Sequence, residues 1–374
     1  MRLSPVLRDM TTYPFVRLTE AKRRLVAAGV DVIDFGMGEP REETPHFIRA
    51  AVAHEIGAEP VSTYPAAAGL PTLRAAISGW LERRFGVALD PNTEIIPTLG
   101  TKEAIFSLAQ VIDGAVGVPT PGYPVPARGA LFAGREVVEV PLRRESWWLP
   151  DLDALPWDRL GLLWLNTPGN PTGVAAPVAF LAEAAERCRE HDVVLACDEA
   201  YSELWFEGPP PASALQAGLA NVVVFNTLSK RSSMPGYRSG FAAGDPQIIE
   251  ALKRYRPNVG TAPQTFIQRA SVAAWNDEEH VVATRRRYAA KRDVVLPALT
   301  AAGLEPAGGN ASFFLWMRAP EGFAERALER GIVVAPGDYL GPGGEGHVRV
   351  ALVPTLEECE RAAAVLTAPS AGPR

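Results

Sequence analysis

NVVVFNTLSKRSSMPGYRSGF, residues 221–241, begins with a run of apolar residues and turns polar at a single lysine. The run NVVVF has the composition of a central parallel strand, which is buried on both faces. Lys230 follows that strand within a few residues. In open α/β sheets, ligands bind beyond the carboxyl ends of the strands. The stretch therefore predicts an α/β fold with Lys230 at the ligand-binding edge of its sheet.

Apolar strands alternate with amphipathic helices on both sides of this stretch. The alternation predicts a mostly parallel, seven-stranded sheet sandwiched by helices. The expected strands are Glu94–Leu99, Ala115–Thr120, Glu136–Pro141, Leu160–Leu165, Val193–Cys197, Asn221–Asn226 and Gly240–Ala243. The expected helices between them include Lys102–Ile112, Pro177–His191 and Asp245–Tyr255. The segment Glu207–Gln216, EGPPPASALQ, has the composition of a surface loop.

The character of the chain changes near residue 265. A long helical stretch is expected from Phe266 to about Leu299. It is followed by the strand-like runs GGNASFFLWM and HVRVAL, with a helix near Phe323–Arg330 between them. The chain has 374 residues, and single cores stop growing at roughly 250–300 residues. We therefore expect a large domain over 42–265 and a smaller α+β domain built from 1–41 and 266–374.

Composition and charge exclude several classes of protein. The net charge of −6 is a poor match for nucleic acid or anionic lipid, so neither partner is expected. No apolar run approaches the roughly 20 residues of a membrane helix, and MRLSPVLRDM has no continuous apolar core of a secretory signal. The three cysteines show no CxxC pairing, which fits the reducing cytoplasm, and no metal site is expected.

Polar groups follow five of the predicted strands. Because these strand ends share one edge of the sheet, the groups should converge there. They comprise Gly100-Thr101-Lys102, Pro121-Gly122-Tyr123, Asn166–Gly173 (NTPGNPTG), Asp198 with Tyr201, and Lys230. A carboxylate, an amine, phenols and a turn of phosphate size form a set that a purely structural protein does not need.

Each of these residues also has a purely structural interpretation. A lysine at a strand end more often extends its stem along apolar surface than performs chemistry. Only five lysines are present, and the other four lie in charged helical runs or open a helix. A lysine held among cations such as Arg231 and Arg238 loses pKa, which makes its amine nucleophilic.

Asp198 and Arg349 likewise allow two interpretations. A buried carboxylate such as Asp198 could cap a helix or pair with an internal cation, or it could pair with a cationic ring nitrogen of a cofactor. Gly-Thr turns are common in α/β proteins, but their free backbone N–H groups suit phosphate, to which Arg238 could add a bidentate charge. Arg349 lies on an apolar strand, so an internal ion pair and a bound substrate carboxylate are equally good explanations for it.

Taken together, these motifs resemble the fold-type I pyridoxal-phosphate-dependent aminotransferases of class I/II. The likeness covers nearly the whole chain in the family's order, and its N-P-T-G and S-K-x(5)-G-x-R-x-G elements are individually specific. The matching stretches are GMGEP (36–40), TYPAAAGLPTLR (63–74), GTKEAI (100–105), PGYP (121–124), NTPGNPTG (166–173), DEAY (198–201), TLSKRSSMPGYRSGF (227–241) and VRVAL (348–352).

The resemblance implies a role for each matching residue. Lys230 forms the Schiff base with pyridoxal 5'-phosphate and, once freed, moves a proton at the substrate's α-carbon. Asp198 pairs with the pyridinium nitrogen, Tyr201 and Asn170 hydrogen-bond the ring's phenolic oxygen, and Tyr123 stacks on the ring. The residues expected around the phosphate are Gly100, Thr101, Lys102, Thr227, Ser229 and Arg238, with Tyr64 reaching it from the neighbouring subunit of a homodimer. The residues expected to bind the substrate carboxylate are Arg349, Asn170 and the backbone at Gly38.

Several stretches are similar to the succinyldiaminopimelate aminotransferases of lysine biosynthesis, among them residues 69–86, 229–245 and 270–281. They imply amino-group exchange between glutamate/2-oxoglutarate and an N-succinylated diaminopimelate, with ping-pong kinetics. Pro126 and the segment Tyr255–Phe266 depart from that subgroup, and Arg231 is a candidate for the extra cation that a polyanionic substrate requires. The alternatives are an aspartate or broad-specificity aminotransferase, a carbon–sulfur (cystathionine) lyase, and a binding protein that has lost turnover.

Overall fold

The computed structural model describes residues 1–368 except 3, 10–13, 59–60 and 62. Its largest sheet has seven strands in the order β2-β8-β7-β6-β5-β3-β4. Their bounds are β2 Ile95–Thr98, β3 Ala115–Thr120, β4 Val137–Pro141, β5 Leu160–Asn166, β6 Val194–Asp198, β7 Val222–Thr227 and β8 Gly240–Gly244. The predicted seven-stranded sheet is confirmed; β8 alone among these seven runs antiparallel to its neighbours β7 and β2.

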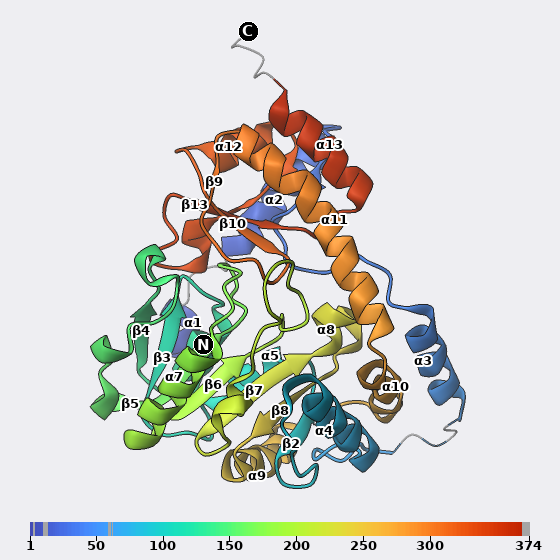
Figure 1. The fold of residues 1–374 in the computed structure, drawn as a ribbon, viewed down its shortest axis with the longest axis vertical. Helices are drawn as coiled ribbons and strands as arrows, with labels where there is room; N and C mark the ends of the chain where they lie inside the picture. The colour runs from blue at the N-terminus through green and yellow to red at the C-terminus, as the bar shows by residue number, and fades with distance from the viewer. Residues whose placement is uncertain (3, 10–13, 59–60, 62, 369–374) are drawn as a thin grey trace.

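Both faces of this sheet are covered by helices, as the apolar strands predicted (Figure 1). Successive strand residues enter opposite cores: Leu195 packs in one with Trp80 of α4 and Leu181 of α7, while Ala196 packs in the other with Leu252 of α9. The helices around the sheet are α3 His46–Ala58, α4 Pro71–Phe85, α5 Lys102–Leu108, α6 Val125–Phe132, α7 Val178–Glu190, α8 Leu228–Arg231, α9 Pro246–Tyr255 and α10 Thr265–Asn276.

A second, four-stranded antiparallel sheet stands above the first in Figure 1, in the order β12-β13-β10-β9. Its strands are β9 Glu305–Pro306, β10 Phe314–Arg318, β12 Ala335–Pro336 and β13 His347–Ala351, and a separate parallel pair joins β1 Ile33–Asp34 to β11 Ile332–Val333. The accompanying helices are α11 Glu279–Ala301, α12 Phe323–Glu329 and α13 Leu356–Thr367. These elements share a core of their own with Phe35, Tyr288 and Leu352.

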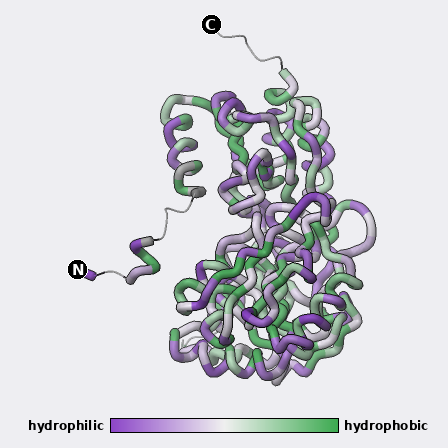
Figure 2. The backbone as a smooth tube through the Cα atoms, turned by 90° about the vertical axis from the view of Figure 1, so that its left-hand side faces the viewer, coloured by the Kyte–Doolittle hydropathy of each residue, from purple (hydrophilic) through white to green (hydrophobic). Residues whose placement is uncertain are grey.

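The remaining elements are two N-terminal helices and a set of 3-10 turns. The N-terminal helices are α1 Pro5–Asp9 and α2 Pro14–Ala27, and Figure 2 shows α1 standing clear of the body of the molecule. The 3-10 turns are η1 Arg144–Ser146, η2 Leu152–Ala154, η3 Trp157–Arg159, η4 Ala214–Ala217, η5 Pro235–Tyr237, η6 Arg256–Val259 and η7 Gly337–Leu340. No helix among the described residues has the length and apolar character needed to cross a bilayer.

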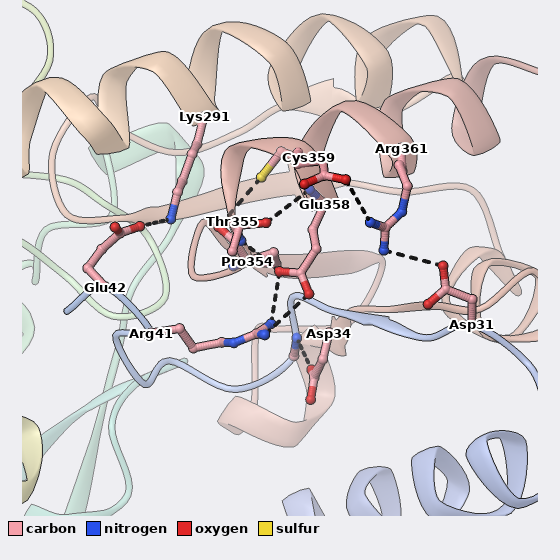
Figure 3. A network of polar contacts seen from close by, with 12 residues as sticks. Asp31, Asp34, Arg41, Glu42, Lys291, Pro354, Thr355, Glu358, Cys359 and Arg361 are labelled. Carbon is pink, nitrogen blue, oxygen red and sulfur yellow. Dashed lines mark hydrogen bonds and ion pairs between the residues drawn. The ribbon is translucent and has the colours of Figure 1, made fainter.

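Ion pairs tie the segment after β1 to the helices of the smaller sheet (Figure 3). Arg41 Nη1 lies 3.0 Å from the Glu358 carboxylate on α13, and the buried Lys291 of α11 pairs with Glu42. This segment includes Gly36 and Gly38, whose carbonyls accept hydrogen bonds from Arg349 and Lys230. The ion pairs therefore hold the backbone that borders the ligand-binding edge.

The stretch from Phe266 to Leu299 is helical as expected, but it forms two helices. Asp277 adopts extended backbone between them, and its carboxylate accepts the His280 N–H at 3.0 Å at the start of the second helix. The segment Glu207–Gln216 is a surface loop only in part, because residues 207–210 are exposed whereas Ser213 is buried and caps η4. The domain boundaries at 41/42 and 265/266 stay a prediction; α10 itself packs on α4, with Trp275 and Trp80 ring centroids 4.8 Å apart.

Candidate active site

A cleft of about 1260 Å³, counted to its open mouth, lies at the carboxyl ends of the parallel strands. Elements of both sheets line it, since β6 and β7 lead into it from below and β13 reaches it from above (Figure 1). The structure brings together here the following predicted residues: Gly38, Thr101, Lys102, Tyr123, Asn170, Asp198, Tyr201, Thr227, Ser229, Lys230, Arg238 and Arg349. Gly100 adjoins the cleft behind Arg238, whereas Tyr64 is fully exposed and does not line it.

Lys230 lies on the one-turn helix α8 and points into the cleft. Its Nζ donates to the Gly38 carbonyl at 2.8 Å and lies 5.3 Å from the ring centroid of Phe313. Burial lowers the pKa of the Lys230 amine from 10.5 to about 8; nearby Glu39 and Asp198 oppose this, while Arg349 and Arg238 add to it. A lysine with a lowered pKa is a better nucleophile and proton acceptor near neutral pH.

Asp198 ends the central strand β6 and is the carboxylate that the sequence placed there. Its Oδ1 accepts the backbone N–H of Ala200 at 3.2 Å. Burial raises the pKa of Asp198 to about 7, although the Ala200 N–H and the nearby Lys230 favour the ionised form. A buried carboxylate with so little compensation suits a cationic ligand that would restore its ordinary pKa.

The opposite end of the cleft gathers groups suited to an anion. Arg238 has left-handed backbone with φ 55°, and its Nη2 donates to the Leu99 carbonyl at 2.8 Å. A Cβ on Gly100, whose φ is +69°, would lie 2.5 Å from Arg238 Nη2, so a side chain there would displace the guanidinium and strain the backbone. Thr227 caps α8 by accepting the Ser229 N–H at 3.1 Å. Arg238, Thr101, Lys102 and these hydroxyls could hold a phosphate.

Arg349 comes from β13 and is buried at the edge of the cleft. Its Nη1 donates to Asn170 Oδ1 at 2.8 Å and its Nη2 to the Gly36 carbonyl at 2.7 Å, while the guanidinium lies 4.5 Å from the Phe314 ring centroid. The Arg349 guanidinium lines the cleft, where it could bind a substrate carboxylate bidentately. The Gly38 backbone lies close to the Phe314 ring, since a Cβ on Gly38 would be 2.7 Å from Phe314 Cζ.

Two tyrosines complete the predicted set within this chain. Tyr201 is buried between Phe313 and Phe314, with ring centroids 5.5 Å and 5.4 Å away, and burial raises the pKa of its phenol. The Tyr123 ring lies at the cleft wall, with Lys102 Nζ 5.8 Å from its centroid. A planar ligand could lie against Tyr123 and reach the Tyr201 hydroxyl.

Sequence reasoning gave no individual role to several residues of the cleft. Met37, Glu39 and Phe314 line it; the GMGEP motif around Gly38 was a signal for the first two. Asn166 also lines the cleft, where its Oδ1 accepts the Asn170 N–H at 2.7 Å and its Nδ2 donates to the Asp198 carbonyl at 2.8 Å. It thereby couples two predicted site residues, and its place at the end of β5 could have identified it.

One predicted substrate contact is wrong. Arg231 follows Lys230 in sequence, but its side chain is only 1% exposed and pairs with Glu278 at 2.7 Å. Its guanidinium lies 5.1 Å and 4.7 Å from the ring centroids of Trp80 and Trp275. The Arg231 side chain therefore points into the core, away from the cleft that Lys230 faces. Neither Pro126 nor the segment Tyr255–Phe266 lines the cleft of this chain.

The donor set fits pyridoxal phosphate on this structure alone. Asp198 presents an incompletely compensated buried carboxylate to a cationic ring nitrogen, Lys230 presents an amine of lowered pKa, and Gly100 leaves the space that Arg238 needs beside a phosphate. The three groups lie in one cleft, with Tyr123 at its wall.

Comparison with known proteins agrees with this chemistry. The family model described as aminotransferase class I and II matches residues 30–366. The chain is 38% identical over 381 residues to an LL-diaminopimelate aminotransferase of Dehalococcoides mccartyi, covering 98% of each chain, and 37% identical to one of Nitratidesulfovibrio vulgaris, covering 94% and 95%.

Solved structures give the same result. The chain superposes on an aminotransferase of Neisseria meningitidis with a TM-score of 0.87 and 34% identity, over 97% of this chain and 99% of that one. An aspartate aminotransferase of Thermus thermophilus gives a TM-score of 0.90 and 31% identity, over 98% and 99%. The chain belongs to the class I and II aminotransferases, a family of pyridoxal-phosphate-dependent enzymes.

Proposed function

We propose that this aminotransferase takes the amino group of LL-diaminopimelate, with 2-oxoglutarate as the acceptor. The observation that carries the proposal is the full-length similarity to enzymes named for that substrate, at 38% and 37% identity. This similarity supports the biosynthetic route that was expected from the sequence, and it favours the free substrate over the N-succinyl derivative.

The charges of the cleft support the free substrate over the succinylated one. The cationic side chains among the described lining residues are Lys102, Lys230, Arg238 and Arg349, and each has a proposed role toward cofactor or α-carboxylate. A succinyl carboxylate would need a further cation, which this lining does not supply. The distal end of LL-diaminopimelate has the same distal carboxylate but carries an ammonium group in place of the succinyl amide, and Glu39 offers that ammonium a carboxylate in the cleft.

The residues divide the chemistry between them. When bound, pyridoxal phosphate supplies an aldehyde that takes up the amino group and a ring that accepts electrons. Arg349 binds the α-carboxylate of the substrate, and Asn170 holds the guanidinium in place. Lys230 acts first as a general base, which takes the proton from the substrate's α-carbon. It then acts as a general acid, which delivers that proton to the cofactor carbon that receives the amino group. Asp198, ionised against the ring nitrogen, keeps that nitrogen protonated.

Arg238, with Ser229 and Thr227, holds the phosphate, so that the reacting end of the cofactor stays beside Lys230. This arrangement holds the reacting groups together before the proton moves. Tyr201 donates its hydroxyl proton toward the ring's phenolic oxygen, and the raised pKa of that phenol keeps it a donor throughout the working pH range.

The cofactor site is tested by reducing the loaded protein with borohydride and mapping the peptides. The pyridoxyl group should be found on Lys230, and Lys230→Ala should yield no modified lysine. A modified lysine elsewhere would contradict the assignment of Lys230.

The substrate is tested by following the cofactor's absorbance with single amino donors. LL-diaminopimelate should convert the cofactor to its amino form fastest, ahead of N-succinyl-LL-diaminopimelate, aspartate and glutamate. A faster conversion by the succinyl compound or by aspartate would replace the proposed substrate with that donor. The similarity to the Thermus aspartate aminotransferase makes aspartate the main rival. Pyruvate and ammonia formed from cystathionine, with no conversion by glutamate, would indicate the lyase.

A further inference from the structure

The helix that carries Lys230 is too short to hold itself in place. α8 spans only Leu228–Arg231, and a single helical turn costs more conformational entropy than its hydrogen bonds return. Its position must come from the side chains that flank Lys230. On the N-terminal side, Thr227 Oγ1 donates to the Ser239 carbonyl at 2.7 Å and accepts the Ser229 N–H at 3.1 Å.

On the C-terminal side, the next residue, Arg231, is anchored in the core. Its guanidinium lies between Trp80 and Trp275, and its Nη2 donates to Glu278 Oε1 at 2.7 Å. Trp275 ends α10 and Glu278 precedes α11, so the anchor for Arg231 is the junction between these helices. A buried guanidinium depends strongly on its carboxylate partner, because an unpaired buried charge is costly.

The following residue, Ser232, is anchored at the same junction. Its Oγ lies 2.8 Å from His280 Nε2, and His280 Nδ1 pairs with Asp277, whose carboxylate also accepts the His280 backbone N–H at 3.0 Å. Asp277 thus fixes the orientation of the imidazole, and the imidazole fixes the Ser232 hydroxyl. Both α10 and α11 contact α8, as Figure 1 shows for the yellow α8 beside the lower end of α11.

The order Ser232, His280, Asp277 is also that of a nucleophile, a base and an orienting acid. Burial excludes that use here. Ser232 is 0% exposed, so no substrate reaches its Oγ. These hydrogen bonds instead make the position of the backbone that carries Lys230 depend on the position of the α10–α11 junction.

We propose that the junction Asp277–His280 is a positioning element for the reaction, which sets the location of the Lys230 amine through its contacts with Arg231 and Ser232. The proposal rests on Lys230 being the cofactor lysine. Because α11 begins at this junction and runs up to the smaller sheet that supplies Arg349, one junction sets the geometry of the proton-transferring amine relative to the substrate-binding guanidinium (Figure 1).

The test compares two substitutions of one residue. His280→Leu removes the contact with Ser232, whereas His280→Gln keeps a polar group near the place of Nε2. In the cofactor-free protein, the pH dependence of Lys230 acylation, measured by peptide mass spectrometry, gives the pKa of its amine. We expect His280→Leu and Ser232→Ala to move that pKa from about 8 toward 10.5, because the amine loses its fixed apolar surroundings. His280→Gln should stay close to the wild type.

In the loaded enzyme, His280→Leu should lower kcat about tenfold or more with little change in KM, since the misplaced group is the proton carrier and not the carboxylate site. Glu278→Gln provides a second variant, which keeps an oxygen acceptor for Arg231 at a side chain that is 45% exposed but removes its charge, and so should lower stability as well. It should shift the Lys230 pKa in the same direction.

The matched control is Asp245→Asn, which weakens the carboxylate cap of another helix, α9, at the opposite end of β7 and β8 from α8. It should lower stability and leave the Lys230 pKa unchanged. Unchanged Lys230 pKa values in Ser232→Ala and Glu278→Gln, or an equal shift in the control, would overturn the proposal. Failure of the cofactor assignment shows separately, as the absence of a pyridoxyl group on Lys230 of the reduced wild-type protein.

Discussion

The burial of Asp198 suits it to bind a cation, but it lowers the folding stability of the cofactor-free protein. Burial raises its pKa from 3.8 to about 7, so the native cofactor-free protein holds a proton that the unfolded chain releases between these values. Stability therefore falls as pH rises from about 4 to about 7 and stays low above that, a loss of up to about 4 kcal/mol. The ring nitrogen of the bound cofactor removes this cost.

This predicts opposite effects of Asp198→Asn on stability and activity. Without cofactor, the variant should be more stable than the wild type, with a gain that grows between about pH 4 and about pH 7 in urea unfolding. With cofactor, its kcat should fall about 100-fold or more, because the ring loses its charged partner. A variant that is less stable than the wild type at the higher pH would contradict the burial argument.

Arg349 should act through the planar fork of its guanidinium. In Arg349→Lys the charge remains, but one ammonium cannot keep Asn170 and the Gly36 carbonyl while also binding a carboxylate bidentately. We expect kcat/KM to fall about 100-fold, chiefly through KM. Arg318→Lys, on the exposed end of the neighbouring strand β10, is the control and should leave both constants unchanged. An unchanged KM in Arg349→Lys would remove Arg349 from the carboxylate site.

Residues at strand ends were predictable because the carboxyl ends of parallel strands all meet at one edge of the sheet. Lys230, Asp198 and Tyr123 needed only that argument. The environment of Arg231 was not predictable, since a one-turn helix sends consecutive side chains in very different directions. The burial of Arg231 between Trp80 and Trp275 depends on α4 and α10, which lie far from it in sequence.

At the scale of elements, the turn after β2 tests the phosphate site. Gly100→Ala introduces a Cβ where φ is +69° and where Arg238 Nη2 would be 2.5 Å away. Gly86→Ala, with φ +71° and nothing within 4 Å, introduces the same backbone strain alone. Both should lose about 1 kcal/mol of stability, but only Gly100→Ala should also weaken cofactor binding, by about tenfold as measured by titration. Equal cofactor affinities would contradict the role of this turn.

The direction of β8 and the break between α10 and α11 escaped prediction for different reasons. GFAAG is apolar and short, and such a run fits a parallel or an antiparallel central strand equally well. The helix break depends on the Asp277 carboxylate accepting a backbone N–H, a local bond that competes with a helical pattern continuing on both sides. The apolar sequence predicts which strands are buried, but not these local choices.

At the scale of the whole molecule, one predicted cofactor contact does not reach the cleft of its own chain. Tyr64 is fully exposed, and so, in large part, are Ile56 of α3 and Leu7 of α1. Figure 2 shows α1 extending away from the body. A predicted cofactor contact that lies outside its own cleft suits a site shared between subunits, and twofold dimers are the commonest oligomers. We therefore expect a homodimer in which Tyr64 enters the partner's cleft, and a monomeric mass by light scattering would contradict this.

Mixed dimers distinguish a Tyr64 that serves its partner from one that serves its own chain. Tyr64→Phe alone should weaken cofactor binding about tenfold through loss of one hydrogen bond to phosphate, and Lys230→Ala alone should be inactive. If Tyr64 crosses the interface, a dimer of one chain of each variant has one site with both changes and one site with neither. Coexpressed variants should then regain activity at limiting cofactor, approaching half of the wild-type value per mixed dimer. If Tyr64 acted within its own chain, every site would carry one change, and mixing would restore nothing.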